Sequence, residues 1–330
     1  MKNISSIQAS IAPELKRLND RIADTLHSSN PLMNRVIDNY LQTKGKQIRP
    51  ILVILSAKIF GSVDENVISA AAAVELLHNA SLIHDDVVDE TKLRRNSPTI
   101  NGLWDNHIAV LVGDFFVSSS LAQALLTNDM RIIGAIASLG KLLSLGEIDQ
   151  IYNARYHNLN EAAYFETIYR KTASLFVACI EVGAYAVNAP ENLIEAMRIY
   201  ANQLGLCFQI RDDIFDYFDD EKNIGKPTGN DLREGKITLP LLHVLLDPSA
   251  PDHEEMKELA MKDNLTTDEI NRLIIYARDN GGIDYAYSVM ENLREKALAP
   301  LAIFPPSETL DALRDIFEFV IERDKYIPKN

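Results

Sequence analysis

The chain has 330 residues, of which 47% are hydrophobic and 24% charged, the composition of a globular protein with a large core. A formal net charge of −14 at pH 7 argues against a nucleic-acid ligand, because phosphate backbones need a basic surface. The negative charge does not exclude a small anionic substrate, provided that basic residues gather locally and a metal ion lies between the acidic residues and the substrate.

Neither a membrane span nor a secretion signal is predicted. No uninterrupted apolar run reaches the roughly 18 residues that a transmembrane helix needs, and the N-terminal residues lack an apolar signal-peptide core. The two cysteines, Cys179 and Cys207, lie in apolar helical stretches, which favours reduced thiols over a disulfide. We therefore expect a cytoplasmic protein without an integral membrane segment. Because no repeat or Pro/Gly-rich linker divides the chain, we also expect a single domain over residues 1–330.

The hydrophobic pattern predicts helices almost throughout. The stretch 66–90 is apolar all round and gathers polar residues only at its end, as in a helix buried in a bundle. Similar patterns predict helices at about 104–127, 131–157, 160–187 and 191–220, with loops at 94–102, 126–129, 188–192 and 223–236 and shorter amphipathic helices from 237 to 325. Sustained period-two alternation is absent from the sequence. We expect an all-α bundle of ten or more helices.

Crowded carboxylates end the helix expected at 66–90. Asp85 and Asp89 are four residues apart, so they share one helix face, with Asp86 beside them. Like charges at this spacing destabilise a helix unless something binds them. The segment is therefore either a solvated helix end or a cation site, and a few carboxylate oxygens are the ligands that Mg²⁺ favours.

The same pattern recurs at the end of the helix expected at 191–220, in Asp212, Asp213 and Asp216. A single such motif is weak evidence, but acidic residues at two helix C-terminal ends oppose the helix dipole twice. Their repetition favours metal binding over two solvated helix ends.

Basic residues gather near both aspartate clusters. Arg94 and Arg95 follow the first; Lys226, Arg233 and Lys236 follow the second; Lys44, Lys46 and Arg49 precede another helix, and Arg170 and Lys171 lie mid-chain. Any one of them alone is more often a solvated surface charge. Their grouping in an acidic protein favours a shared anionic ligand, since Arg suits bidentate phosphate contacts and Lys acts as a point charge. Together the clusters indicate a Mg²⁺–diphosphate site.

These motifs resemble those of the trans-isoprenyl diphosphate synthases, the polyprenyl synthetase family. The matching stretches are, in family order, 45–50, 75–89 with Arg94 and Arg95, 113–115, 146–150, 171–173, 208–216 and 225–240. Two loop positions depart from the family pattern: Asn96 stands where Gly is usual, and Lys44-Gly45 replaces a double Gly. Neither departure removes a charged group.

The resemblance implies an all-α homodimer of the isoprenoid synthase type, whose two aspartate-rich helix ends face each other across a central cavity. Asp85, Asp89 and Asp212 would bind Mg²⁺ bridging an allylic diphosphate, with Asp86, Asp213 and Asp216 in support. Arg94, Lys171, Lys226 and Lys236 would hold the same diphosphate, and Lys46, Arg49, His78 and Arg95 would hold isopentenyl diphosphate. Thr172 and Gln209 would point their oxygens at the developing allylic cation.

A lone histidine on an apolar helix is usually a core residue. His78 lies two turns before Asp85 on the same face, which favours the substrate-binding role; His84 has no such support and is expected to be structural.

The implied reaction joins C1 of an allylic diphosphate to C4 of isopentenyl diphosphate. Ala80 and Ser81, five and four residues before Asp85, are small and would leave the cavity open by at least one further isoprene unit. They favour an all-trans product of C30 or longer, such as octaprenyl diphosphate, over farnesyl or geranylgeranyl diphosphate, although small residues also serve helix packing. A class I terpene cyclase is the alternative of another class, but its second metal site usually mixes Asn, Ser or Thr with an acid.

Overall fold

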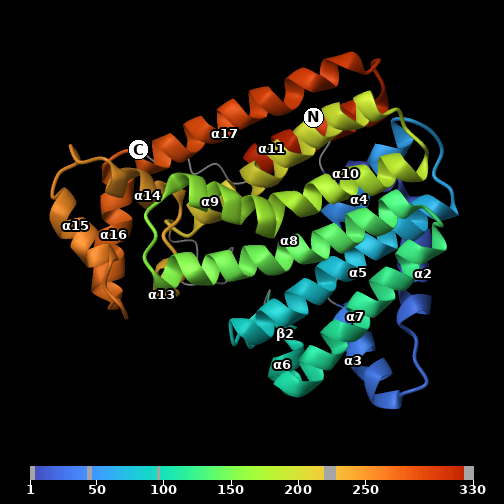
Figure 1. Ribbon diagram of the computed structural model, residues 1–330, viewed down its shortest axis with the longest axis horizontal. Helices are drawn as coiled ribbons and strands as arrows, with labels where there is room; N and C mark the ends of the chain where they lie inside the picture. The colour runs from blue at the N-terminus through green and yellow to red at the C-terminus, as the bar shows by residue number, and fades with distance from the viewer. Residues whose placement is uncertain (1–3, 43–46, 95–96, 219–227, 323–330) are drawn as a thin grey trace. The chain divides into compact units, whose positions relative to one another are not determined.

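The computed structural model describes residues 4–42, 47–94, 97–218 and 228–322, and these are almost entirely helical (Figure 1). The α-helices are α1 (Ile4–Ser10), α2 (Ala12–Leu26), α3 (Pro31–Gln42), α4 (Ile48–Lys58), α5 (Glu65–Val88), α6 (Ile100–Leu103), α7 (Asn106–Leu126), α8 (Met130–Arg155), α9 (Glu161–Ile168), α10 (Ser174–Ala186), α11 (Glu191–Phe215), α13 (Asn230–Arg233), α14 (Leu239–Leu246), α15 (His253–Ala260), α16 (Thr267–Asp279), α17 (Gly282–Leu298) and α18 (Glu308–Glu322). The π-helix η1 (Tyr169–Ala173) joins α9 to α10, and the 3₁₀-helix η2 (Ala299–Ile303) follows α17.

The all-α prediction of ten or more helices is confirmed. Four of the five long helices lie within a few residues of their predicted bounds, as α5, α7, α8 and α11. The fifth, expected at 160–187, is α9, η1 and α10 in succession. Within the predicted loop at 94–102, β1 (Leu93–Arg94) pairs antiparallel with β2 (Ser97–Pro98).

The chain forms two compact units, each assembled from separate segments. The first comprises residues 1–141, 175–201 and 300–319, and the second comprises 142–174, 202–299 and 320–330. The single domain expected over residues 1–330 stays a prediction.

Helix α5 is the centre of the first unit: it packs along α7, and α4 and α2 also pack on it (Figure 1). Its run Ala70–Ala73 is completely buried, because methyl side chains let neighbouring helices approach on every side. The Asp64 carboxylate accepts a hydrogen bond from the Val67 amide at 3.1 Å and caps the helix N-terminus.

By length and composition, two described helices, α5 and α7, could cross a membrane. The apolar window is 72% buried in α5 and 44% buried in α7. The hydrophobicity of α5 is therefore accounted for by its place in the core, while the expected absence of an integral membrane segment stays a prediction.

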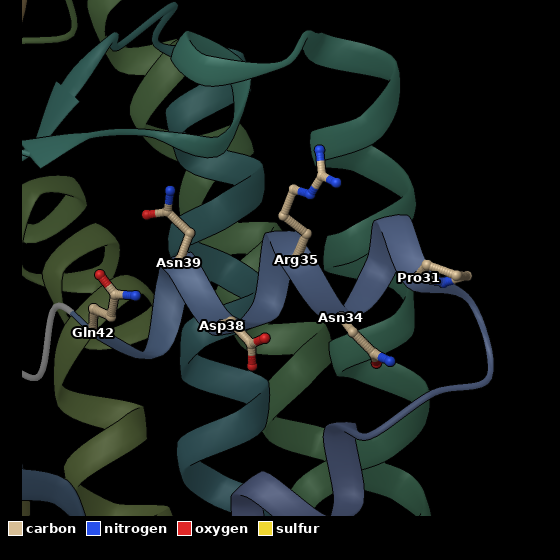
Figure 2. Close-up of a pocket in the computed structure, with 6 residues that line it drawn as sticks. All are labelled: Pro31, Asn34, Arg35, Asp38, Asn39 and Gln42. Carbon is tan, nitrogen blue, oxygen red and sulfur yellow. The ribbon is translucent and has the colours of Figure 1, made fainter.

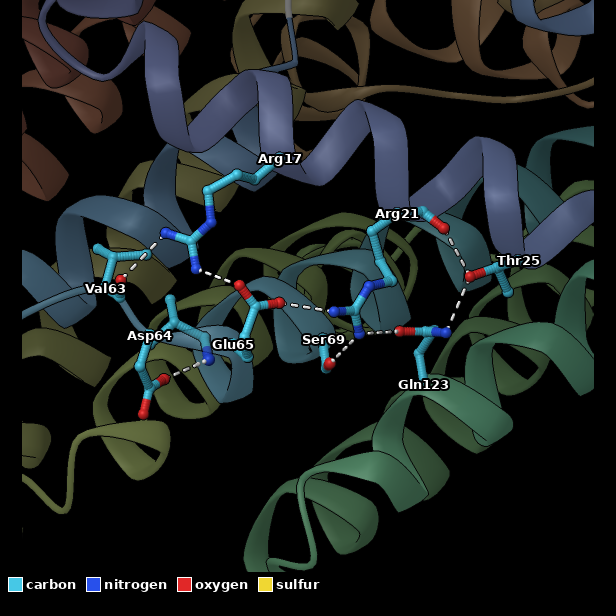
Figure 3. A network of polar contacts seen from close by, with 9 residues as sticks. Arg17, Arg21, Thr25, Val63, Asp64, Glu65, Ser69 and Gln123 are labelled. Carbon is cyan, nitrogen blue, oxygen red and sulfur yellow. Dashed lines mark hydrogen bonds and ion pairs between the residues drawn. The ribbon is translucent and has the colours of Figure 1, made fainter.

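A network of charged residues fixes α2 against α5 and α7 (Figure 3). Glu65 lies between two arginines of α2, and its two carboxylate oxygens accept hydrogen bonds from Arg17 and Arg21 at 2.6 Å each. Arg21 also donates to the Ser69 hydroxyl at 2.8 Å, and the Gln123 amide of α7 donates to Thr25 at 2.8 Å. These contacts orient the N-terminal helices on the helix that carries the first aspartate cluster.

Helix α14 is the centre of the second unit and contacts α16, α17 and α9 (Figure 1). Gly282, at the start of α17, permits a close approach, because a Cβ there would lie 2.2 Å from the carbonyl oxygen of Pro240. Arg211 of α11 is 3% exposed and donates to the Val320 carbonyl at 2.8 Å. Cys179 and Cys207 are both buried free thiols, as the sequence predicts.

Candidate active site

The first aspartate cluster lies where α5 ends. Asp89 is the C-cap of α5, and its amide donates to the Asp85 carbonyl at 2.8 Å. Asp85 is half-buried and Asp89 is exposed, whereas Asp86 is only 6% exposed. The Asp86 carboxylate accepts from Arg94 at 2.9 and 2.7 Å, so this arginine connects β1 to the cluster. Asp85 and Asp89 are therefore the more accessible residues of this cluster.

The second aspartate cluster also contains one exposed, one buried and one half-buried residue, namely Asp212, Asp213 and Asp216. The Asp212 side chain is 46% exposed, and its carboxylate accepts from Arg211 at 2.8 Å. The Asp216 carboxylate instead accepts from the backbone amides of Asn230 and Asp231, at 2.9 Å each. It thereby fixes the start of α13, since the first amides of a helix have no partner within the helix.

Asp213 is 4% exposed, and both its carboxylate oxygens accept hydrogen bonds. The Tyr164 hydroxyl donates to one at 2.6 Å and the Gln209 amide to the other at 2.8 Å. Burial raises the pKa of the Asp213 carboxyl above its usual range and the Asp231 carboxylate raises it further, while the two donors lower it. Burial also raises the pKa of Tyr164 well above its usual value of 10, so its hydroxyl remains a neutral donor.

Lys171 and Thr172 lie in the π-helix η1, a conformation often found at functional sites. The Thr172 hydroxyl donates to the Gln209 side-chain carbonyl at 2.7 Å. The Lys171 ammonium lies 2.6 Å from a Glu147 carboxylate oxygen and donates to Gln150 at 3.1 Å. The motif at 146–150 therefore holds this lysine in place.

A cavity of about 90 Å³ adjoins these groups in the second unit. Its polar lining includes Tyr164, Lys171, Gln209, Asp213, Asp231 and Lys236. The Lys236 amide donates to the Asp231 carbonyl at 2.8 Å, and its ammonium pairs with Glu234. Four predicted site residues are thus brought to one cavity: Lys171, Gln209, Asp213 and Lys236.

Sequence reasoning missed Tyr164 and Asp231. The Gln209–Asp213 contact follows from their i, i+4 spacing on one helix and could have been predicted. Tyr164 is one of 12 tyrosines and lies in a different helix, so no local pattern marks it.

The other predicted residues are in the first unit or outside the described chain. Arg49 lies at the start of α4, and its guanidinium is 5.7 Å from the centroid of the Phe176 ring. The Ser81 hydroxyl donates to the His78 carbonyl at 2.9 Å, and both residues are half-buried. Ala80 is completely buried. Lys46, Arg95 and Lys226 lie outside the described residues.

The donor chemistry of both clusters fits a hard divalent cation. Asp85, Asp89 and Asp212 offer oxygen ligands only, the donor type that cations such as Mg²⁺ prefer. Within the described ranges, no three His, Cys, Asp or Glu side chains converge as a ready-made metal site. The predicted facing of the two clusters across a central cavity stays a prediction.

A larger concavity, of about 560 Å³, lies on α3 and is not a candidate site. Figure 2 shows Arg35 and Asn39 pointing to one side of this helix, and Asn34 and Asp38 to the other. All its lining residues come from a single helix, so they do not converge on a ligand.

An all-α fold with two aspartate-rich helix ends, an arginine on the first and lysines near the second, is typical of the isoprenoid synthase class. The polyprenyl synthetase family model matches residues 30–276. The octaprenyl diphosphate synthase of Haemophilus influenzae is 32% identical over 324 residues, covering 98% of each chain. The chain belongs to the polyprenyl synthetase family and is a polyprenyl diphosphate synthase, a prenyltransferase.

Solved structures support the same assignment. A polyprenyl synthase from Caulobacter crescentus, complexed with calcium and isoprenyl diphosphate, is 32% identical with a TM-score of 0.89, covering 97% of this chain and 98% of that one. A geranylgeranyl pyrophosphate synthase from Bacteroides thetaiotaomicron is 39% identical with a TM-score of 0.82, covering 97% and 99%. Relatives therefore include both long-chain and short-chain enzymes.

Proposed function

We propose that the protein condenses isopentenyl diphosphate with an allylic diphosphate to give an all-trans polyprenyl diphosphate of C30 or longer. The observation that carries this proposal is the cavity where Lys171 and Lys236 adjoin Gln209. Cleavage of the allylic C–O bond separates a negative diphosphate from a positive allyl group. Ammonium groups stabilise the first, and the oxygens of Thr172 and Gln209 stabilise the second.

Asp85, Asp89 and Asp212 are the residues proposed to hold Mg²⁺, because Asp89 and Asp212 are exposed and Asp85 is half-buried, whereas Asp86 and Asp213 are buried. When bound, the metal would stabilise the negative charge on the departing diphosphate. Asp86 and Asp213, which are buried, and Asp216, which is half-buried, are proposed to support the metal ligands. Arg94, Lys171, Lys226 and Lys236 are proposed for the allylic diphosphate, and Lys46, Arg49, His78 and Arg95 for isopentenyl diphosphate. The released diphosphate is the proposed base for the final proton.

The long product is supported by Ser81, a small half-buried residue one turn before Asp85. The octaprenyl relative is consistent with it, and the geranylgeranyl relative makes the short-chain alternative the competing outcome. Ala80, completely buried, contributes less directly, because its side chain already contacts packed neighbours.

A homodimer is proposed from the exposed face of α7. Leu111, Leu121 and Leu125 recur there at helical spacing and are 60%, 42% and 59% exposed. An apolar stripe of this kind on a helix marks a protein–protein contact, and a second copy supplies a self-complementary partner. A cytoplasmic location is proposed as well, in keeping with the two free thiols.

The reaction is tested by incubating the purified chain with farnesyl diphosphate and labelled isopentenyl diphosphate, with and without Mg²⁺. We expect Mg²⁺-dependent incorporation of label into a diphosphate ester. A hydrocarbon formed from farnesyl diphosphate alone would instead indicate a terpene cyclase.

The metal proposal is tested by a Mg²⁺ titration of Asp212→Asn. We expect the Mg²⁺ concentration for half-maximal rate to rise about tenfold or more. Asp38→Asn, on the exposed face of α3, is the control and should leave it unchanged. An unchanged Mg²⁺ requirement in Asp212→Asn would remove this residue from the metal site.

A further inference from the structure

Four side chains of the second unit form one continuous hydrogen-bonded series. The Thr172 hydroxyl donates to Gln209, the Gln209 amide donates to Asp213, and the Tyr164 hydroxyl donates to the other oxygen of Asp213. The distances are 2.7, 2.8 and 2.6 Å. Three separate helical segments, α9, η1 and α11, contribute to the series.

The geometry gives every bond in this series one direction. Both Asp213 oxygens accept, one from the Tyr164 hydroxyl and one from the Gln209 NH₂, which leaves the Gln209 carbonyl to accept from Thr172. A carbonyl only accepts, so the Thr172 hydrogen must point at Gln209. The lone pairs of the Thr172 oxygen are therefore left facing away from the series.

We propose that Tyr164 is a positioning residue for the ionisation step: through Asp213 it fixes the Gln209 amide and hence the Thr172 hydroxyl, whose lone pairs stabilise the allylic cation. This inference rests on the proposed function. It also assigns Asp213 an orienting role, distinct from metal coordination, because both its oxygens are occupied by donors and it is 4% exposed.

The position of Tyr164 supports this role. Its hydroxyl is the only contact in the series that reaches Asp213 from a helix other than α11, so it fixes the carboxylate against rotation about its own side chain. Without it, Gln209 is the one donor to Asp213 left among the described residues, and the two side chains can rotate together. A misplaced dipole loses much of its catalytic effect, since preorganised dipoles act through fixed geometry.

Tyr164→Phe removes only the hydroxyl, and Tyr200→Phe is its matched control. Tyr200 is also buried, and its hydroxyl donates to the Leu313 carbonyl at 2.7 Å in the first unit. Both variants are expected to lower the melting temperature. Only Tyr164→Phe should lower kcat, by about tenfold, with the KM for isopentenyl diphosphate within about twofold. An equal kcat for the two variants would refute the positioning role.

A double-mutant cycle with Thr172→Val asks whether Tyr164 acts through the threonine. We expect Tyr164→Phe to have no further effect on kcat once the Thr172 hydroxyl is gone. Effects that multiply in the double variant would show that Tyr164 acts independently, and would overturn the proposal.

Asp213→Asn distinguishes the orienting role of Asp213 from metal binding. It also provides a second test of the proposal if Tyr164→Phe does not fold. The substitution keeps the shape of the side chain, but the new amide can donate its NH₂ to Gln209. The Gln209 carbonyl would then accept from residue 213, and the direction of the hydrogen bonds from there to Thr172 would be reversed. We expect kcat to fall with the Mg²⁺ concentration for half-maximal rate unchanged; a raised Mg²⁺ requirement would make Asp213 a metal ligand and refute the inference. Wild type is assayed first: its failure to condense the substrates would refute the proposed function itself.

Discussion

Gly146 and Lys171 approach so closely that a Cβ on Gly146 would lie 2.7 Å from the Lys171 backbone nitrogen. It would also lie 3.0 Å from the carbonyl carbon of Arg170. The backbone of η1 can therefore rest directly on α8, where Glu147 and Gln150 hold the Lys171 ammonium. The glycine of the motif at 146–150 is thus required by packing.

Gly146→Ala is expected to displace η1 and with it Lys171 and Thr172. Because the added methyl meets backbone, the displacement cannot be absorbed by a side-chain rotation. A shift of this size should lower kcat about 10- to 100-fold, measured with saturating substrates.

Gly134→Ala is the control for this substitution. Gly134 lies in the same helix, α8, with no atom within 4 Å of its added Cβ. Alanine there should stabilise the protein by up to about 1 kcal/mol and leave kcat unchanged. If both variants are fully active, the contact between α8 and η1 does not position Lys171.

Ser81 and Ala80 should respond differently to a bulky side chain. Ser81→Phe is expected to shorten the longest product by about one or two isoprene units, each about as long as one helical turn of ~5 Å. Because Ser81 is half-buried, this variant should keep its stability. Ala80→Phe, in a completely buried position, should instead cost about 1–3 kcal/mol of stability. Mass spectrometry of the products and thermal melts distinguish the two variants. If Ser81→Phe gives products of unchanged length, Ser81 does not control product length.

A charge on the exposed face of α7 should dissociate the proposed homodimer. Leu111→Glu is expected to shift the protein from dimer to monomer in sedimentation experiments, because an interface core excludes unpaired charge. Ile275→Glu, at an equally exposed position of α16 (55% against 60%), should remain dimeric. A monomeric wild type, or a Leu111→Glu dimer as tight as wild type, would contradict the proposal.

Glu269 makes the stability of α16 depend on pH. A hydrogen bond from Lys262, with further bonds from Thr266, lowers the pKa of this carboxyl from 4.5 to about 2. A lowered folded-state pKa stabilises the protein above the unfolded value, and the stabilisation is lost as pH falls from about 4.5 towards 2. Urea unfolding should therefore show Glu269→Gln less stable than wild type at neutral pH, with the difference narrowing in acid. Glu258→Gln, an exposed control on α15, should show neither effect.

The helices could be predicted because their signals are local. The apolar periodicity of α5, α7, α8 and α11 and the breakers between them give the bounds almost directly. The π-helix inside the predicted helix at 160–187 was not predicted. It lies against α8 at Gly146, a tertiary contact that the local periodicity does not show.

Motif spacing predicts six aspartates at two helix ends, and their roles in the site stay predictions. The spacing did not predict how their environments differ: Asp213 contacts Tyr164 of α9, and Asp216 caps α13. Tyr164 was missed for the same reason. Tertiary contacts of this kind leave no pattern in a single sequence.

The length of the longest product tests the proposed long-chain reaction most directly. Purified wild-type protein, given farnesyl diphosphate and excess isopentenyl diphosphate with Mg²⁺, is predicted to yield a ladder of all-trans products ending at C30 or longer by mass spectrometry. A ladder that stops at C20 would contradict the long-chain assignment, and the absence of any metal-dependent elongation would contradict the reaction itself.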